Sequence, residues 1–329
     1  MSDEQGIEAG PVFKDRSTGL IVFGILQIAL GALCVLVLVL MALGIAATRA
    51  MNETGPAAMS WQMMVPGLFL YGAMGAWFIT MGIGSVMARR WARALTLISS
   101  AIWLMGGVSG LVVMLVFMPD VYAQMGEKGQ IPPEMAVVMK YVMAGSLLVF
   151  GVFLPGMLLL FYGRKNVKAT CEFRDPNVRW TDACPLPVLA VSLLCCAMSL
   201  SMLTTGSYGW ALPFFGRVVS GATGAAVAIS VAVVFMCLAW GMYRLRAAAW
   251  WGMLAMIVVW GVSTMLTFSR TGMSDFYKAM NLPPEQLEIV NQTGFAQSPW
   301  FAVYCGVWIA VFIGYLMYIR KYFKAPKSV

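Results

Sequence analysis

Eight long apolar stretches follow one another along the chain, separated by short polar segments. They lie near residues 19–46, 65–88, 94–118, 136–162, 186–206, 218–243, 248–268 and 299–319. Each is long enough to cross the hydrocarbon core of a bilayer, which needs about 20 residues of helix. The apolar positions are continuous rather than alternating, which excludes the strands of a membrane barrel. The pattern therefore predicts an all-α polytopic membrane protein with eight transmembrane helices.

Composition agrees with this interpretation. Hydrophobic residues make up 60% of the chain and charged residues 11%, and the mean hydropathy is +0.80. A soluble domain has an apolar share of about 45–50%. The N-terminal segment 1–18 carries four acids and has no short apolar core followed by a cleavage site, so we expect the first stretch to be retained as a span.

The basic residues are distributed unevenly between the two sides that eight spans define. If the N-terminus lies in the cytoplasm, 16 of the 22 lysines and arginines face that side. They are Lys14, Arg16, Arg89, Arg90, Arg93, Arg164, Lys165, Lys168, Arg174, Arg179, Arg244, Arg246, Arg320, Lys321, Lys324 and Lys327. The positive-inside rule then predicts that both termini are cytoplasmic.

The two halves of the chain share polar landmarks. Tyr162-Gly-Arg-Lys recurs as Tyr318-Ile-Arg-Lys at an offset of 156, and Pro132-Pro-Glu recurs as Pro283-Pro-Glu. Shared residues at a nearly constant offset indicate a duplicated four-helix unit. An even number of spans per unit makes the two copies parallel. Each Pro-Pro-Glu also predicts a helix start; for the second we expect a surface helix over 283–292.

These features predict a linear domain plan. A cytoplasmic segment 1–18 precedes the first repeat at 19–162, a cytoplasmic connector at 163–185 joins it to the second repeat at 186–319, and a tail follows at 320–329. The connector mixes acids, bases and prolines, which suggests a mostly extended segment against the membrane face. Since its run 174–182 has no counterpart in either repeat, its candidate partner-docking residues are Arg174, Asp175, Arg179, Trp180 and Asp182.

Ionisable residues are scarce inside the predicted spans. Lys140 is the one Asp, Glu, Lys or Arg within them, and the chain has no histidine. Ion-coupled transporters and proton pumps place ionisable groups at membrane depth, and helical haem proteins use histidine ligands. The sequence therefore argues against both classes. It offers no catalytic set and no cofactor motif, so we predict that the protein is not an enzyme.

Sulfur residues offer one weak metal hypothesis. Met135, Met139 and Met143 share a helical face at the spacing of a Cu(I) site. No matching set exists in the second half, so methionine as a flexible packing residue is the better interpretation. Cys171 and Cys184 of the connector lack the further ligands of a zinc site. No metal or cofactor is predicted.

Small and polar residues in the spans predict helix contacts. Gln27 is the one span amide, and hydroxyls such as Ser199 and Ser263 are expected to bond neighbouring carbonyls. Gly106 and Gly110 form a small-xxx-small pair, which also predicts a contact between helices. Pro155 in the fourth span could kink that helix and open a cavity.

Taken together, the sequence favours a structural or accessory subunit of a larger membrane assembly. The alternative is a channel or carrier for a neutral or lipid-like substrate at the repeat interface. Expected partners are membrane lipids and other membrane subunits or further copies of the chain, and not nucleic acid. The economical loops favour a bacterial inner membrane. In a eukaryotic source, Asn52 and Asn291 would be glycosylation sites.

Overall fold

The computed structural model describes residues 13–50, 61–127, 132–280 and 299–324, which are mostly helical. Within them, eight helices are long and apolar enough to cross a membrane, so the eight predicted spans are confirmed. They run over Ser17–Ala47, Val65–Val86, Arg90–Leu115, Val137–Tyr162, Leu186–Tyr208, Gly221–Tyr243, Ala247–Thr271 and Val303–Phe323. The chain is an integral, multi-pass membrane protein. Many large apolar side chains on these helices are exposed, as lipid contact requires.

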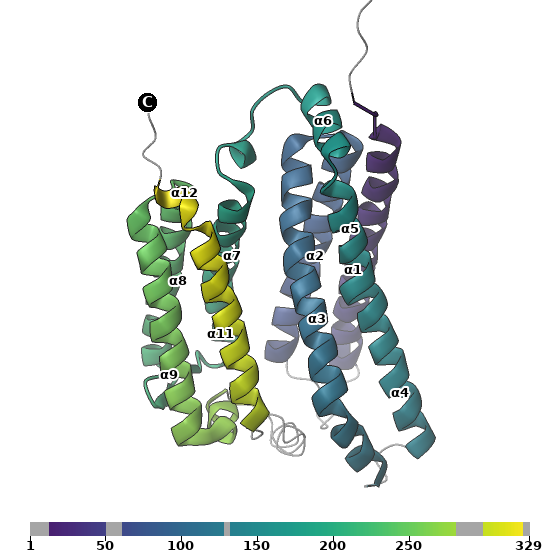
Figure 1. Cartoon of the computed structure of the whole chain (residues 1–329). Helices are drawn as coiled ribbons and strands as arrows, with labels where there is room; N and C mark the ends of the chain where they lie inside the picture. Colours follow the sequence, from purple (N-terminus) through teal and green to yellow (C-terminus); the bar gives the residue numbers. More distant parts are fainter. Residues whose placement is uncertain (1–12, 51–60, 128–131, 281–298, 325–329) are drawn as a thin grey trace, which may run out of the picture. The chain divides into compact units, whose positions relative to one another are not determined.

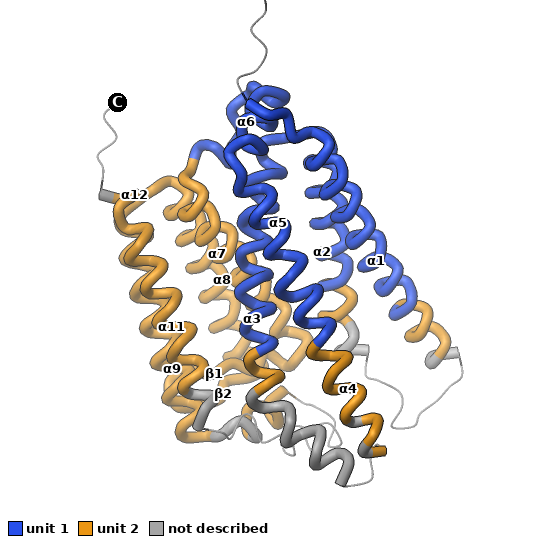
Figure 2. Tube along the Cα trace, turned by 45° about the vertical axis from the view of Figure 1, so that its right-hand side comes forward, with its two compact units in different colours: residues 1–41, 70–111, 145–183 blue, residues 42–69, 112–144, 184–329 orange. Residues whose placement is uncertain are grey.

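The chain divides into two compact units, coloured in Figure 2. Unit 1 comprises residues 1–41, 70–111 and 145–183, and unit 2 comprises 42–69, 112–144 and 184–329. The elements of the first half are α1 (Ser17–Ala50), α2 (Trp61–Val86), α3 (Arg90–Glu127), α4 (Pro133–Ser146), the π-helix η1 (Leu147–Phe153), α5 (Leu154–Tyr162), α6 (Lys165–Arg174) and the 3₁₀ turn η2 (Trp180–Asp182). They are drawn from purple to teal in Figure 1.

In unit 1, α1 and α2 approach each other through glycines. A Cβ atom on Gly24 would lie 2.8 Å from the Gly82 carbonyl oxygen, and one on Gly31 would lie 2.9 Å from that of Gly75. Such close backbone approach requires glycine and is typical of packing between membrane helices. The two glycines of α1 are seven residues apart, so they lie on one face of the helix.

A tight turn joins α2 to α3. Ala88 adopts a left-handed conformation with φ of 52°, and the Arg89 amide donates to the Gly84 carbonyl at 2.8 Å. A Cβ atom on Gly84 would lie 2.6 Å from the Cβ of Ala92, so glycine is required where the two helices meet. The turn places Arg89 and Arg90 at what we call the basic end of unit 1, together with α6 and η2.

The fourth span is interrupted before Pro155. Proline has no amide hydrogen, so the Gly151 carbonyl cannot receive the usual helical bond, and η1 occupies this position. That carbonyl faces Gly107 of α3, where a Cβ atom would overlap it. The break therefore brings two backbones together at this point. The contact glycine is Gly107 and not Gly106, whose Cβ position has no neighbour within 4 Å, because the face of α3 turns by 100° per residue.

The second half forms a similar set of contacts within unit 2. Its elements are α7 (Leu186–Thr204), the 3₁₀ turn η3 (Thr205–Tyr208), β1 (Leu212–Phe214), β2 (Arg217–Val219), α8 (Gly221–Tyr243), α9 (Ala247–Ala279), α11 (Pro299–Ile319) and α12 (Lys321–Lys324). Ser192 and Ser199 of α7 donate to the carbonyls of Ala239 and Ala232 of α8, both at 2.8 Å. The prediction that span hydroxyls bond neighbouring carbonyls is confirmed at Ser199.

A short β-hairpin precedes α8, in a region that the sequence pattern predicted as a loop. β1 pairs antiparallel with β2 in the register Leu212↔Val219 and Phe214↔Arg217. The two turn residues, Phe215 and Gly216, have φ of 41° and 83°. Their amides donate to Ser263 Oγ at 2.9 Å and Thr267 Oγ1 at 3.0 Å on α9. The chain is thus mostly rather than wholly helical, and Ser263 bonds a turn amide instead of a helix carbonyl.

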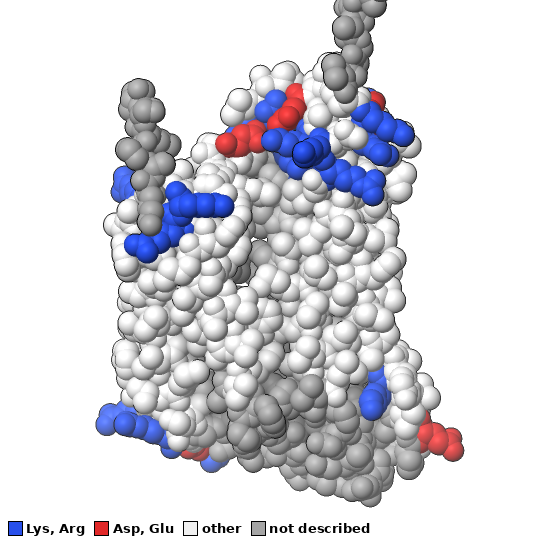
Figure 3. Space-filling model, viewed as in Figure 1, with Lys and Arg blue, Asp and Glu red and all other residues white. Residues whose placement is uncertain are grey.

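Charged side chains lie at helix ends. In unit 1, Figure 3 shows lysines and arginines gathered where α6 lies. In unit 2, a second group lies beside α12. The visible middle part of the long helices in each unit is white. The first Pro-Pro-Glu begins a helix as predicted, since α4 starts at Pro133 with Glu134 in its first turn. The predicted helix 283–292, and Asn52 and Asn291, lie outside the described residues.

Candidate functional site

The connector folds into helix rather than extended chain over much of its length. Residues Lys165–Arg174 form α6, whose buried side chains Val167, Thr170 and Cys171 recur at helical spacing. Pro176 ends the helix. The Thr170 hydroxyl oxygen accepts a hydrogen bond from the Arg16 amide at 3.1 Å, which fixes α6 to the chain before α1. The prediction of a mostly extended connector was wrong because the mixed charges concealed this apolar face.

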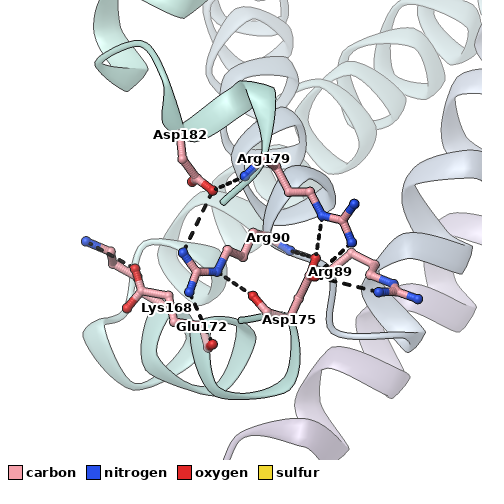
Figure 4. A network of polar contacts seen from close by, with 7 residues as sticks. All are labelled: Arg89, Arg90, Lys168, Glu172, Asp175, Arg179 and Asp182. Carbon is pink, nitrogen blue, oxygen red and sulfur yellow. Dashed lines mark hydrogen bonds and ion pairs between the residues drawn. The ribbon is translucent and has the colours of Figure 1, made fainter. Parts of the chain in front are cut away.

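Asp175 lies at the centre of the connector, surrounded by arginines (Figure 4). Its side chain is 1% exposed. Arg179 donates to it twice, from Nε at 3.2 Å and from Nη2 at 2.9 Å. Arg89 Nη1 lies 3.6 Å from Oδ1, and the Arg90 amide donates at 3.4 Å. The buried carboxylate therefore ties the turn between α2 and α3 to the connector.

Asp182 and Arg90 complete this cluster. Asp182 accepts from the Arg179 amide at 3.0 Å and pairs with Arg90 Nη1 at 3.9 Å. Arg90 also donates through Nε to the Asp175 carbonyl at 2.6 Å and through Nη2 to the Glu172 carbonyl at 3.2 Å. One guanidinium thus satisfies backbone carbonyls at the end of α6, where helices leave acceptors unpaired.

The bonds to Asp175 control its titration. The hydrogen bond from Arg179 lowers the pKa of the Asp175 carboxyl below its ordinary value, and Arg90 and Arg89 act in the same direction. The same pair raises the pKa of Arg179. Nearby, burial raises the pKa of the Cys171 thiol to about 11, so this cysteine is protonated and unreactive at neutral pH.

The five predicted docking residues have different surroundings. Asp175, Arg179 and Asp182 are brought together and bond mainly to one another and to the α2–α3 turn. Arg174 lies apart and pairs with Asp15 at 3.6 Å. Hydrogen bonds from Ser17 lower the pKa of the Asp15 carboxyl, and the positive charge of Arg174 lowers it further. Trp180 is 49% exposed.

The connector also exposes apolar side chains that sequence reasoning missed. Phe173 is 68% exposed and Val178 is 75% exposed, in a segment outside the spans. Phe173 contacts Phe13 edge to face at 5.9 Å, yet most of its ring remains accessible. Their signal in the sequence was an apolar residue directly before the charged run 174–182, Phe173, and another inside it, Val178. We call the area that these two side chains and Trp180 expose the connector apolar surface.

A buried chain of polar side chains runs through unit 1. Thr96 donates to Gln27 Oε1 at 3.5 Å, and Gln27 Nε2 donates to the Tyr162 hydroxyl at 2.9 Å. Ser85 donates to the Leu20 carbonyl at 2.9 Å, so the Tyr162 hydroxyl donates to Ser85 Oγ. Gln27, Ser85 and Tyr162 are each at most 1% exposed. These hydrogen-bonded side chains link α1, α2, α3 and α5, and the last bond is accepted by the Leu20 backbone carbonyl.

The methionine row and the connector cysteines differ in exposure. Met135, Met139 and Met143 lie on α4, and each is partly exposed, Met135 at 54% and Met139 at 38%. Cys171 and Cys184 are buried, and neither forms a disulfide within the described residues. Within the described residues, no group of three His, Cys, Asp or Glu could hold a metal ion. The Cu(I) hypothesis at the methionines stays a prediction.

Charged groups are confined to helix ends in the spans as the structure bounds them. No Asp or Glu lies in the eight membrane spans of the described residues, although α3, α4 and α9 carry acids beyond their spans. Arg90 and Arg93 lie in the first turn of α3, and Arg93 Nε donates to the Tyr162 carbonyl at 3.0 Å.

Comparisons with protein-family models, with curated proteins and with solved structures find no match.

Proposed function

We propose that the protein is a non-enzymatic structural or accessory subunit of a larger membrane assembly, which docks a partner on its connector. The observation that carries this proposal is the connector apolar surface. Phe173, Val178 and Trp180 are 68%, 75% and 49% exposed on a segment outside the spans. Exposed apolar side chains rimmed by charged groups mark surfaces for protein contact.

The buried polar groups of unit 1 support a structural role. In the chain from Thr96 to Ser85, each donor has an acceptor within the bundle. Substrate and proton pathways use ionisable groups at membrane depth. The hydrogen bonds here instead hold four helical segments in one arrangement.

We further propose that the two halves are parallel copies of one four-helix unit. The turn bond from Arg89 to Gly84 has a counterpart from Arg246 to Gly241, 157 residues later. At the same offset, Leu245 repeats the left-handed φ of Ala88, 55° against 52°. These matches support an origin by duplication.

Contacts between helices support the same alignment. Gly24 meets Gly82 and Gly31 meets Gly75 in unit 1, while Ser192 bonds Ala239 and Ser199 bonds Ala232 in unit 2. The offsets are 168 for the first helix and 157 for the second in both pairs.

The last helix of each half accepts an equivalent hydrogen bond, but the bonded residues align at a different offset. Arg93 Nε donates to the Tyr162 carbonyl, and Trp250 Nε1 donates to the Leu316 carbonyl at 2.8 Å. This pairing aligns Tyr162 with Leu316 at an offset of 154, two residues from the 156 of the Tyr-x-Arg-Lys motif. Contacts therefore align this helix differently from the sequence motif.

We also propose that the basic ends face the cytoplasm of a bacterial inner membrane, with both termini inside. The positive-inside rule supports this orientation, because 16 of the 22 lysines and arginines lie in the segments that it places in the cytoplasm. In a cysteine-free background, Lys165→Cys should react with a membrane-impermeant maleimide only after cell lysis. Phe215→Cys, on the hairpin, should react in intact cells, and the reverse pattern contradicts the orientation.

Site-specific photo-crosslinking in intact cells tests the docking proposal. A photoreactive amino acid replaces Val178, which is 75% exposed, and in a control replaces Leu160 of α5, which is 74% exposed and lies in a span. We expect one discrete protein adduct from position 178 and none of that mass from position 160. No protein adduct at 178, or the same adduct at both, contradicts the proposal. Transport of a neutral solute by the purified chain in vesicles would instead favour a carrier.

A further inference from the structure

A pocket of about 410 Å³ opens on the surface of unit 1 where α2 meets the connector. Ile83 and Met87 form its apolar wall, and Trp91 lies beside them. The Trp91 ring packs on Gly84, where a Cβ atom would lie 2.8 Å from the ring. Glycine at this position therefore leaves room for the indole.

Two arginines close the end of this pocket away from the membrane-spanning part of α2. Arg89 and Arg179 line it, and both side chains are 35% exposed. They converge on Asp175, as Figure 4 shows. Three guanidinium groups, with Arg90, face the two carboxylates of Asp175 and Asp182, so the cluster retains positive charge.

The ion pairs leave donors available. Arg179 uses Nε and Nη2 on Asp175, and Arg89 contributes Nη1 at 3.6 Å. The remaining guanidinium N–H groups, Nη1 of Arg179 and Nε and Nη2 of Arg89, have no bond within the described residues. Asp175 fixes both side chains in place, and a fixed guanidinium recognises phosphate oxygens with little loss of side-chain freedom.

We infer that this pocket binds one anionic phospholipid, with its phosphate on Arg89 and Arg179 and an acyl chain along Ile83 and Met87. The polar and apolar parts of the pocket follow each other in the order of a lipid headgroup and chain. Trp91 lies at the start of its span, the level at which tryptophan contacts headgroups. Basic pockets beside membrane helices bind anionic headgroups in this way.

Unit 2 supplies a matched comparison. Counting 157 residues on from the turn of unit 1, Arg246 takes the place of Arg89, and Arg244 takes the place of Met87. Arg244 lies over the Trp240 ring, 4.8 Å from its centroid, so a cation covers the ring at the position of the apolar wall. Nothing in unit 2 corresponds to Arg179, since the connector is unique to the chain. We therefore place the lipid in unit 1.

Lipid titration of the full-length chain tests the site. Delipidated protein in detergent is mixed with phosphatidylglycerol or phosphatidylcholine, and native mass spectrometry counts the retained lipid. Wild type should retain one phosphatidylglycerol at least about fivefold more strongly than phosphatidylcholine, in line with about 1 kcal/mol per basic residue near an anionic surface. Arg89→Gln should abolish this preference. Thr80→Trp, which fills the pocket and leaves the ion pairs intact, should weaken binding of both lipids.

Two controls decide between this site and general basicity. Arg246→Gln in the equivalent turn and Lys168→Gln on the exposed face of α6 should retain the lipid as wild type does. If either lowers retention as much as Arg89→Gln, the inference is overturned. If inorganic phosphate displaces phosphatidylglycerol at equal concentration, the pocket recognises a free anion and the lipid is excluded. If Thr80→Trp and Arg89→Gln both fold and retain the lipid unchanged, the pocket is not its site.

Discussion

At the scale of single residues, Gly107 and Gly151 determine how closely α3 approaches the fourth span. A side chain on Gly107 would overlap the Gly151 carbonyl oxygen, which belongs to backbone and cannot move aside as a flexible side chain can. Gly106, its neighbour, is exposed and has open space at its Cβ position. The two positions offer the same chemical change in two environments.

We predict that Gly107→Ala destabilises the protein by about 1–3 kcal/mol, the usual cost of overpacking a core, while Gly106→Ala leaves stability nearly unchanged. Thermal unfolding of each variant in one detergent checks this difference. Equal melting temperatures for the two variants would show that the helices do not meet at Gly107.

The Tyr162 hydroxyl offers a second residue-level prediction. Tyr162→Phe leaves the buried Gln27 amide without its acceptor. Since hydrogen bonds within membrane bundles are worth about 1–2 kcal/mol at most, we expect a loss of that size. Tyr315→Phe is the control, because its half-buried hydroxyl donates to the Pro187 carbonyl and leaves no buried amide donor behind. In a double-mutant cycle, adding Gln27→Leu to Tyr162→Phe should recover part of the lost stability, because the unpaired amide is then removed. Strictly additive losses of unfolding free energy would contradict the hydrogen bond between these two side chains.

At the scale of elements, the hairpin shows why the sequence pattern predicted helices and not strands. Each strand has three residues, too few for an alternating pattern to register. The hairpin turn is held by Ser263 and Thr267, which are distant in sequence and accept hydrogen bonds from the two turn amides. Eight spans were readable because each depends on local composition, whereas the hairpin, the polar chain and the α6 contacts depend on which residues meet in space.

We expect Ser263→Ala with Thr267→Val to release the turn, because two amides lose their acceptors at about 1–3 kcal/mol each if they stay buried. Hydrogen exchange of the Phe215 and Gly216 amides should rise at least about tenfold. Ser269→Ala, which removes an exposed hydroxyl bonded within its own helix, serves as the control. Unchanged exchange in the double variant would contradict the role of these hydroxyls.

The connector should open in acid. The pKa of Asp175 is lowered in the folded protein, so its ion pairs stabilise the connector above the ordinary value of 3.8 and this contribution is lost as the pH falls through the folded pKa. Hydrogen exchange over residues 165–183, corrected for the intrinsic rate, should therefore rise below about pH 4. Asp175→Asn should raise exchange at pH 7 by about tenfold and remove the acid transition. Asp275→Asn, at an exposed pair with Lys278, should do neither.

At the scale of the whole molecule, membrane class and span number followed from the sequence, and the burial of Asp175 within the connector did not. The charged run 174–182 was read as available to a partner, yet Asp175 is 1% exposed and bonded internally. The exposed apolar groups are Phe173, Val178 and Trp180. Of the predicted residues, Trp180 is 49% exposed and the Arg174 side chain is 48% exposed. Charge pattern alone cannot separate a carboxylate that holds the fold from one that faces solvent.

The mass of the particle in its native membrane tests the subunit proposal most directly. The tagged chain, of 35.8 kDa, is extracted with its surrounding lipid into polymer nanodiscs and weighed by native mass spectrometry. We predict a particle that contains other protein subunits, or further copies of the chain, in a fixed ratio, and loss of these subunits in a Val178→Glu variant that keeps its fold. A wild-type particle that holds a single copy of this chain and lipid alone would contradict the proposal.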